Sequence, residues 1–215
     1  KGLLLEYTHI LTRGQRLSDL LADQIAARVS DPDRALELDI LRCGAWAGAA
    51  NAAIDASRLA RTLDVSEADL SRALQRLIEE HLIRSPAPGA VTGLHQLRSE
   101  ELLKLTHETA LPTLQASIER TAASVNSSDL ERLIASTLSM RRLTLDDVLD
   151  GVTPRLESHA DARELAAALR GLAAGRVIIG VDEWLETPEA RALPRTQIGN
   201  AAMSGATGVD LASLR

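Results

Sequence analysis

The chain of 215 residues contains no Phe, one Tyr and two Trp, and its formal net charge is −6 with neutral histidines. So few aromatic side chains leave little surface on which single-stranded nucleic acids or sugars stack, and the negative charge disfavours phosphate backbones and anionic membranes. Leu, Ala, Ile and Val at helical spacing must fill the core instead, which predicts a mainly α fold of helices packed on helices.

The amino-terminal part reads as helical. Apolar residues over positions 3–29 follow a helical period that Gly14 interrupts, which predicts two helices meeting at a bend. Residues 30–33 then combine Ser and Asp with a Pro near a helix start, and residues 34–53 are Ala-rich and apolar. We expect a helical segment over residues 1–31, followed by a buried helix.

The next stretch has the order of a winged helix. Residues 55–63 predict a short amphipathic helix, and Ser66 caps a second helix that runs to His81. Strands at residues 82–84 and 90–95 follow, on either side of a turn rich in Pro. Two helices at helix-turn-helix spacing and a β-hairpin predict a winged helix, in a domain of residues 32–110.

Short amphipathic helices fill much of the remainder, residues 111–215. Turn and cap residues separate them at irregular spacing, the last unit covers residues 162–174, and residues 177–179 fit a strand or a buried helical turn equally well. This part predicts a repeat-like helical array flanking the winged helix. Trp184 is a candidate anchor for a partner, since buried indoles dominate many interfaces, and packing inside the array is its alternative.

The sequence carries no motif for catalysis. It has no phosphate-binding glycine loop with a Lys-Ser/Thr pair, no His-x-x-x-His pair and only one cysteine, Cys43. Adjacent acids such as Asp146 and Asp147 point about 100° apart on a helix and do not converge on one substrate atom. We therefore expect no enzyme, no metal and no cofactor in this chain. A lone cysteine and the lack of a long apolar run indicate a cytoplasmic location, away from membranes.

A winged helix often binds DNA, but the charge of this one counts against that function, so DNA binding is kept only as an alternative. Residues 55–108 contain seven basic and nine acidic residues, a net charge of −2, and the turn of the hairpin carries no Lys or Arg. Glu67 and Asp69 occupy the start of the would-be recognition helix, where DNA phosphates would repel them. In a transcription regulator with a helical dimerisation or ligand domain, the DNA contacts would come from Arg58, Arg72, Arg76 and Arg84.

Segments 2–8, 11–17, 77–84 and 92–99 resemble bacterial STAND proteins, the signal-transduction ATPases with numerous domains. The resemblance implies that a P-loop domain precedes this chain. This chain would then supply the helical lid (residues 1–31), the winged helix and the helical sensor. The resemblance also implies a regulatory function, in which the winged helix clamps the nucleotide-binding domain in cis and the array senses a ligand or protein trigger. ADP or ATP would be bound by the parent protein, and DNA is not an expected partner.

The same resemblance singles out His95. In the family, a His at the end of the winged helix, within a Met-His-Asp-like motif, contacts the nucleotide phosphate and holds the ADP-bound state closed. His95 occupies that position, with Leu94 in place of Met and Gln96 in place of Asp. The alternative for His95 is structural, as a helix cap or as a side chain packed beneath the wing.

Overall fold

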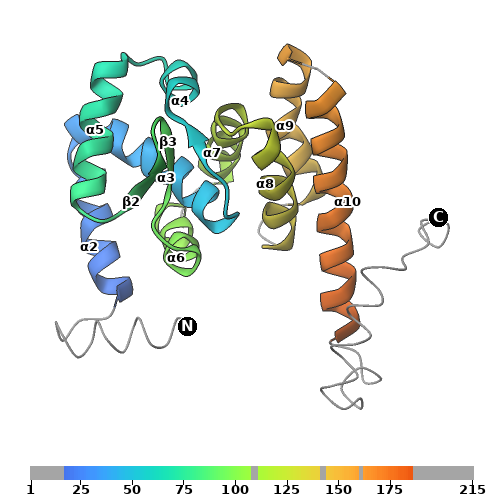
Figure 1. The fold of residues 1–215 in the computed structure, drawn as a ribbon. Coiled ribbons are helices and arrows are strands. Elements are labelled where there is room, and N and C mark those ends of the chain that lie inside the picture. Colours follow the sequence, from blue (N-terminus) through green and yellow to red (C-terminus); the bar gives the residue numbers. More distant parts are fainter. Residues whose placement is uncertain (1–16, 108–110, 141–143, 160–161, 186–215) are drawn as a thin grey trace.

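The computed structural model describes the backbone of residues 17–107, 111–140, 144–159 and 162–185, and their side chains except at 17, 111–112, 158–159 and 177–185. The described residues are mainly helical and include one small antiparallel sheet (Figure 1). The predicted mainly α class is therefore confirmed. No helix in these ranges is long and apolar enough to cross a membrane.

The first half of the described chain arranges short helices around the sheet. In chain order its elements are α2 (Leu17–Val29), η1 (Pro32–Arg34), α3 (Ala35–Ala49), β1 (Ile54–Asp55), α4 (Ala56–Thr62), α5 (Glu67–Glu79), β2 (Ile83–Ala87), β3 (Ala90–Gly93) and α6 (Gln96–Thr106). The strands lie in the order β1-β3-β2, with Ile54 opposite Val91 and Ile83 opposite Gly93. The hairpin of β2 and β3 thus follows two consecutive helices, α4 and α5.

Local capping explains where these helices begin and end. Asp55 accepts a hydrogen bond from the Arg58 amide (2.8 Å) at the start of α4, and Ser66 accepts one from the Asp69 amide (3.1 Å) at the start of α5. The expected Ser66 cap is confirmed. At the other end, α5 stops at Glu79, two residues short of the expected His81. The φ of His81 is 56°, in the left-handed region, and the Leu82 amide then donates to the Leu77 carbonyl (2.9 Å).

Two glycines let the sheet lie directly on α3. A Cβ added to Gly48 would stand 2.7 Å from the Cα of Gly93, closer than real Cβ contacts. The Thr92 hydroxyl also donates to the Ala52 carbonyl (2.7 Å), just beyond the end of α3. The end of β3, and the start of the helix that follows it, are therefore fixed against a buried helix.

Strand β3 is shorter than the sequence suggested. We expected strand structure up to His95, but β3 ends at Gly93 and His95 is the N-cap of α6. The imidazole accepts a hydrogen bond from a free amide of the first helical turn, and this local bond places His95 at the helix start rather than in the sheet.

The second half consists of helices that pair across the chain order. They are α7 (Leu111–Ser124), α8 (Ser127–Ser139), α9 (Leu145–His159) and α10 (Ala162–Leu185). Helix α7 packs along α9 and α8 packs along α10. A Cβ on Gly151 of α9 would stand 2.7 Å from Ile118 Cγ2 of α7, so that pair is closely packed.

Helix α10 is longer than the unit we expected at residues 162–174. It runs on through Gly171 and Gly175 to Leu185, so residues 177–179 are helical rather than a strand. Its glycines are contact points: a Cβ on Gly171 would stand 2.7 Å from the Glu131 carbonyl oxygen, and one on Gly175 would stand 2.6 Å from a Leu138 methyl carbon. Close packing on α8 overrides the weak helix propensity of glycine.

One hydrophobic core spans both halves. It extends from Leu21 of α2 to Ala168 of α10 and includes the fully buried Trp46. The Ala53 amide donates to the Asp129 carboxylate at the start of α8 (3.1 Å), which crosses the expected boundary between residues 110 and 111. The division into segments 1–31, 32–110 and 111–215 remains a prediction, and positions 1–16, with the bend at Gly14, lie outside the described residues.

Candidate functional site

His95 stands exposed at the start of α6, two residues beyond the sheet. Its Nδ1 accepts a hydrogen bond from the Leu97 amide (3.3 Å). An unprotonated Nδ1 places the single proton of the neutral ring on Nε2, which has no partner among the described residues. The cap thus prepares the outer ring nitrogen as a hydrogen-bond donor, at the positive end of the α6 dipole.

The backbone on each side of His95 is held firmly. Gly93 is pressed against α3, and the His95 carbonyl accepts the first intrahelical bond of α6, from the Ser99 amide (2.9 Å). Ser99 itself is fully buried. A group bound at His95 would therefore meet an imidazole carried on a firmly packed backbone.

The four candidate DNA-contacting arginines are all bonded within the chain. Arg72 forms an ion pair with Asp69 one turn away, and Arg76 Nε lies 3.0 Å from Glu37 Oε1. Arg58 donates to the Val125 carbonyl (3.3 Å) and Arg84 to the Gly93 carbonyl (3.4 Å). These separate bonds draw the four guanidinium groups to different partners.

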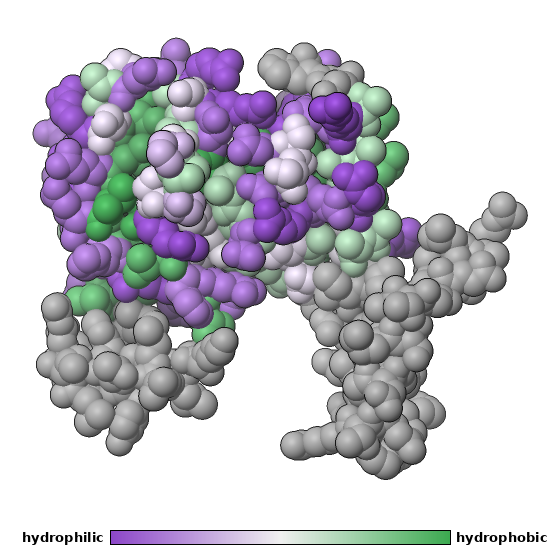
Figure 2. Space-filling view, in the orientation of Figure 1, coloured by the Kyte–Doolittle hydropathy of each residue, from purple (hydrophilic) through white to green (hydrophobic). Residues whose placement is uncertain are grey.

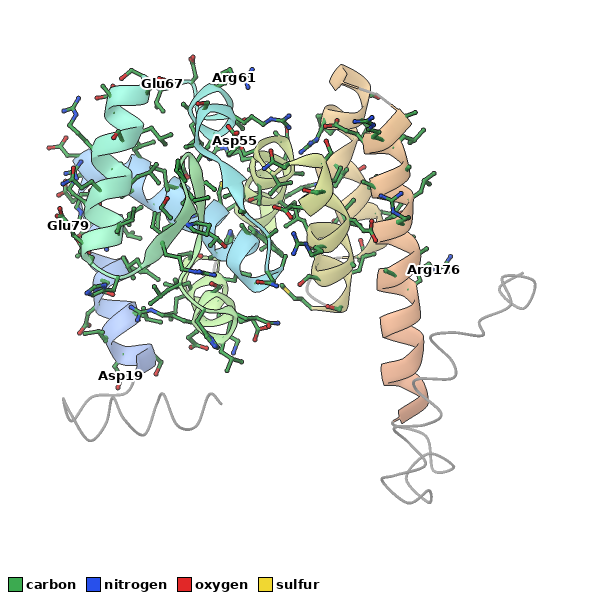
Figure 3. All side chains as sticks on the ribbon, in the orientation of Figure 1. Asp19, Asp55, Arg61, Glu67, Glu79 and Arg176 are labelled. Carbon is green, nitrogen blue, oxygen red and sulfur yellow. The ribbon has the colours of Figure 1, made fainter. Side chains whose placement is uncertain are left out.

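Acidic residues also lie on the helix that would enter a DNA groove. Figure 3 shows Glu67 and Glu79 at opposite ends of α5, with both side chains directed outward. Asp69 is exposed in the first turn of the same helix. The face that DNA would approach therefore presents carboxylates together with Arg72.

A buried ionic network lies behind α5. Arg28 of α2, with a fully buried side chain, places Nε 3.2 Å from Glu37 of α3 and Nη2 2.5 Å from Glu80, just after α5. Arg34 contacts the same two carboxylates at 2.7 Å each. Burial raises the pKa of Glu80, but hydrogen bonds from Arg28 and Arg34 outweigh it and the pKa is lowered overall. The network fastens α2 to α3 and α5.

Sequence reasoning missed this network. Arg28 and Glu80 are 52 positions apart, so no helical spacing connects them. The only available signal was local: Arg34 and Glu37 are three residues apart and form an ion pair across one helical turn.

A second buried cluster joins the two halves of the core. The Trp46 indole N–H donates to the Ser117 hydroxyl oxygen (3.1 Å), and His107 Nε2 lies 2.6 Å from the same oxygen. His107 Nδ1 lies 3.0 Å from the Leu103 carbonyl, and the two rings meet edge to face with centroids 6.3 Å apart. Trp46 and Ser117 are buried and His107 is half-buried. Because the Ser117 hydroxyl is shared by groups of the core, we assign this contact a structural role.

Trp184, the candidate partner anchor, lies near the end of α10. Its side chain is outside the described residues, so its role stays a prediction. Neither Trp184 nor the four arginines are brought next to His95 by any contact that the structure describes.

Surface grooves in the described part lie between helices. One, of about 280 Å³, lies between α6 and α8, and another, of about 180 Å³, lies between α4 and α5. In the first, Lys104 is paired with Glu101 (3.1 Å) and the Ser139 hydroxyl donates to the Ser136 carbonyl (2.7 Å). The Lys104 ammonium and the Ser139 hydroxyl are thus already bonded within the chain. Among the described residues, no three His, Cys, Asp or Glu side chains gather to hold a metal ion.

Comparison with known proteins found no match to a protein-family model, to a curated protein or to a solved structure.

Proposed function

We propose that the elements α3 to β3 form the winged helix of a domain at residues 32–110, and that this chain is the regulatory part of a nucleotide-dependent signalling switch. The supporting fold features are the order α3, β1, α4, α5, β2, β3 and the sheet order β1-β3-β2. In this proposal the winged helix clamps a P-loop domain that precedes it in the parent protein. The array α7 to α10 receives the trigger, a ligand or a protein, and this chain catalyses nothing itself.

The observation that carries the proposal is the geometry of His95. A neutral imidazole capped through Nδ1 offers the Nε2 proton to a phosphate oxygen, at a helix start that favours anions. A hydrogen bond to a charged group contributes roughly 1.5–3 kcal/mol, which corresponds to tenfold or more in affinity. A bond made only in the closed, ADP-bound state would hold the switch in that state.

DNA binding is the weaker candidate. Arg72, with a side chain 72 % exposed, is the arginine best placed to reach a duplex, but Asp69 already neutralises it. Arg76 is held by the buried Glu37, and releasing it would remove a partner from a carboxylate that is 1 % exposed. Selection from random duplexes is expected to return no consensus site, and a consensus lost in Arg72→Ala would favour DNA binding instead.

The test of the switch compares two substitutions in the parent protein. His95→Ala removes both the cap and the imidazole, whereas His95→Asn keeps a cap residue and removes only the ring. If His95 contacts a phosphate, both variants lose tenfold or more in ADP affinity, measured by calorimetric titration, and both raise basal signalling.

If His95 is only a cap, His95→Asn keeps wild-type ADP affinity, and this outcome contradicts the proposal. Thermal unfolding of both variants provides the check that each is folded. Reading the coding sequence upstream of Lys1 is the first step, because the proposal requires a P-loop domain there.

A further inference from the structure

The outer faces of α9 and α10 expose leucines at helical spacing. Leu165 and Leu169 of α10 are 48 % and 58 % exposed, and Leu145 and Leu149 of α9 are 37 % and 36 % exposed. Each pair is four residues apart and so forms a stripe on one side of its helix. In Figure 2 hydrophobic residues gather at the outer edge of the molecule, over the first turns of α10.

In the described part, α9 and α10 pack against neighbouring helices on the sides opposite these stripes. Gly171 and Gly175 turn one side of α10 onto α8, and Gly151 turns one side of α9 onto α7. The helices pair as α7 with α9 and α8 with α10, so the stack ends at α9 and α10 in the described part. In stacked helical arrays a terminal face of this kind needs a polar cap or a further layer.

The charges beside the two stripes are opposite. Over residues 144–157 the exposed charged side chains are acidic, Asp146, Asp150 and Glu157, because Arg155 is buried. Over residues 162–176 they are basic, because Glu164 is buried: Arg163, Arg176 and Arg170, which also forms an exposed ion pair with Glu131 of α8. Residues 144–157 of α9 therefore complement residues 162–176 of α10 in charge, whereas either segment placed against its own copy would bring like charges together.

We propose that this chain self-associates, with α9 of one copy packing on α10 of a second copy. The leucines of α10 then lie against those of α9, and the acids of one helix flank the arginines of the other. A two-fold axis makes this contact twice and closes the assembly as a dimer. Removing exposed apolar surface drives the association, and the charges select the partner helix. This inference does not depend on the switch proposed above.

Sedimentation velocity over a concentration series tests it on the whole chain. Wild type is expected to pass from monomer to dimer as concentration rises. Leu169→Glu places an acid in the apolar stripe of α10 and is expected to remain monomeric. Leu97, 44 % exposed on α6, gives the matched control: Leu97→Glu is expected to dimerise like wild type. Thermal unfolding of both variants confirms that they fold.

A charge swap identifies the pairing of helices. In this pairing α9 and α10 run antiparallel, with Leu145 opposite Leu169 and Asp146 close to Arg170 of the second copy. Asp146→Arg and Arg170→Glu are each expected to weaken the dimer tenfold or more, and the double variant is expected to recover most of that loss. A dimer that neither single swap affects uses another surface, and this result overturns the proposal. A wild-type chain that stays monomeric at every concentration overturns it as well.

Thiol labelling distinguishes a second copy from other coverings of the face. Cys43, the only cysteine, is fully buried, and burial raises its pKa to about 11, so a thiol in Leu169→Cys is labelled selectively. Labelling is expected to slow as concentration rises. Slow labelling at all concentrations in a chain that sediments as a monomer would mean that the chain covers its own face, and rapid labelling throughout would mean that nothing covers it. Either result contradicts the proposal.

Discussion

The Ser117 hydroxyl connects helices of the two halves of the core. Its hydroxyl oxygen accepts from the buried Trp46 indole and lies beside His107, while its proton has the Thr113 and Leu114 carbonyls within 3.0 Å. Three helices, α3, α6 and α7, therefore meet at one oxygen atom. Buried polar groups of this kind stabilise a fold only while every partner is present.

Ser117→Ala is expected to lower the free energy of unfolding by about 1–3 kcal/mol, because the Trp46 N–H would stay buried without an acceptor. Urea denaturation, followed by circular dichroism, measures the change. Ser57, exposed on α4, provides the comparison, and Ser57→Ala is expected to stay within about 0.5 kcal/mol of wild type. Equal effects in the two variants would contradict the role assigned to Ser117.

Residue roles could be predicted from sequence only where the partner is near in the chain. Ser66 was identified as a cap because its acceptor position and the Asp69 amide are three residues apart. The cap at His95 was left open beside the phosphate role, because imidazole is an uncommon cap and strand structure was expected there. The contacts of Glu37 and of Ser117 had no signal, since they come from elements far apart in the sequence.

At the scale of elements, three helices end in the same way. Asn51 after α3, Asp64 after α4 and His81 after α5 have φ values of 51°, 53° and 56°, in the left-handed region. The amide that follows each one donates to a carbonyl five residues back, at 2.8, 3.0 and 2.9 Å. Each ending closes its helix without glycine, the residue best suited to this conformation.

His81→Gly is therefore expected to raise the free energy of unfolding by about 1 kcal/mol, because glycine adopts positive φ without a Cβ clash. Thermal and urea unfolding measure the gain. The same replacement inside α5, at the exposed Gln75, is expected to lower stability by about 1 kcal/mol. A loss at both positions would show that the His81 side chain contributes more than its conformation costs.

Most elements from α2 to β3 could be predicted in order because their signals are local: caps, turns and period-2 or helical spacing. Strand β1 was missed, because its two residues pair with the distant β3. The length of α10 could not, because Gly171 and Gly175 normally argue against a helix and become favourable only beside α8. The pairing of α7 with α9 and of α8 with α10 likewise depends on contacts between distant segments.

At the scale of the whole molecule, a buried ion pair ties the array together. Arg155 of α9 donates to Glu164 of α10 (2.6 Å) and to the Val125 carbonyl beyond α7 (2.6 Å). The Arg155 hydrogen bond lowers the pKa of Glu164, and the Ser127 hydroxyl at the start of α8 adds to this. One carboxylate thus links α8, α9 and α10.

The lowered pKa fixes the sign of a pH effect. The Glu164 carboxylate binds a proton more readily in the unfolded chain than in the folded one. The stability that its lowered pKa contributes is therefore complete at neutral pH and is lost as pH falls below the ordinary pKa of 4.5. Glu164→Gln is expected to lower the free energy of unfolding by about 3 kcal/mol at pH 7. The free energy of unfolding of this variant is also expected to fall less steeply than that of wild type as the pH is lowered. Urea denaturation from pH 7 to pH 3 measures both effects.

Glu131 provides the matched comparison, because its ion pair with Arg170 also joins α8 to α10 but is exposed on both sides. Glu131→Gln is expected to change stability by less than about 1 kcal/mol and to keep the wild-type decline in acid. If both variants behaved alike, burial would not be what gives the Arg155 pair its importance.

The position of Trp46 has an optical consequence. Its indole is shielded from water at the seam between α3 and α7, beside the imidazole of His107. In a chain carrying Trp184→Phe, Trp46 is the only tryptophan, and its fluorescence comes from that seam alone. Any signal that moves the array α7 to α10 away from α3 would admit water to the indole and shift its emission to longer wavelength. The Trp46 emission wavelength would thus report separation of α7 from α3 without an added dye.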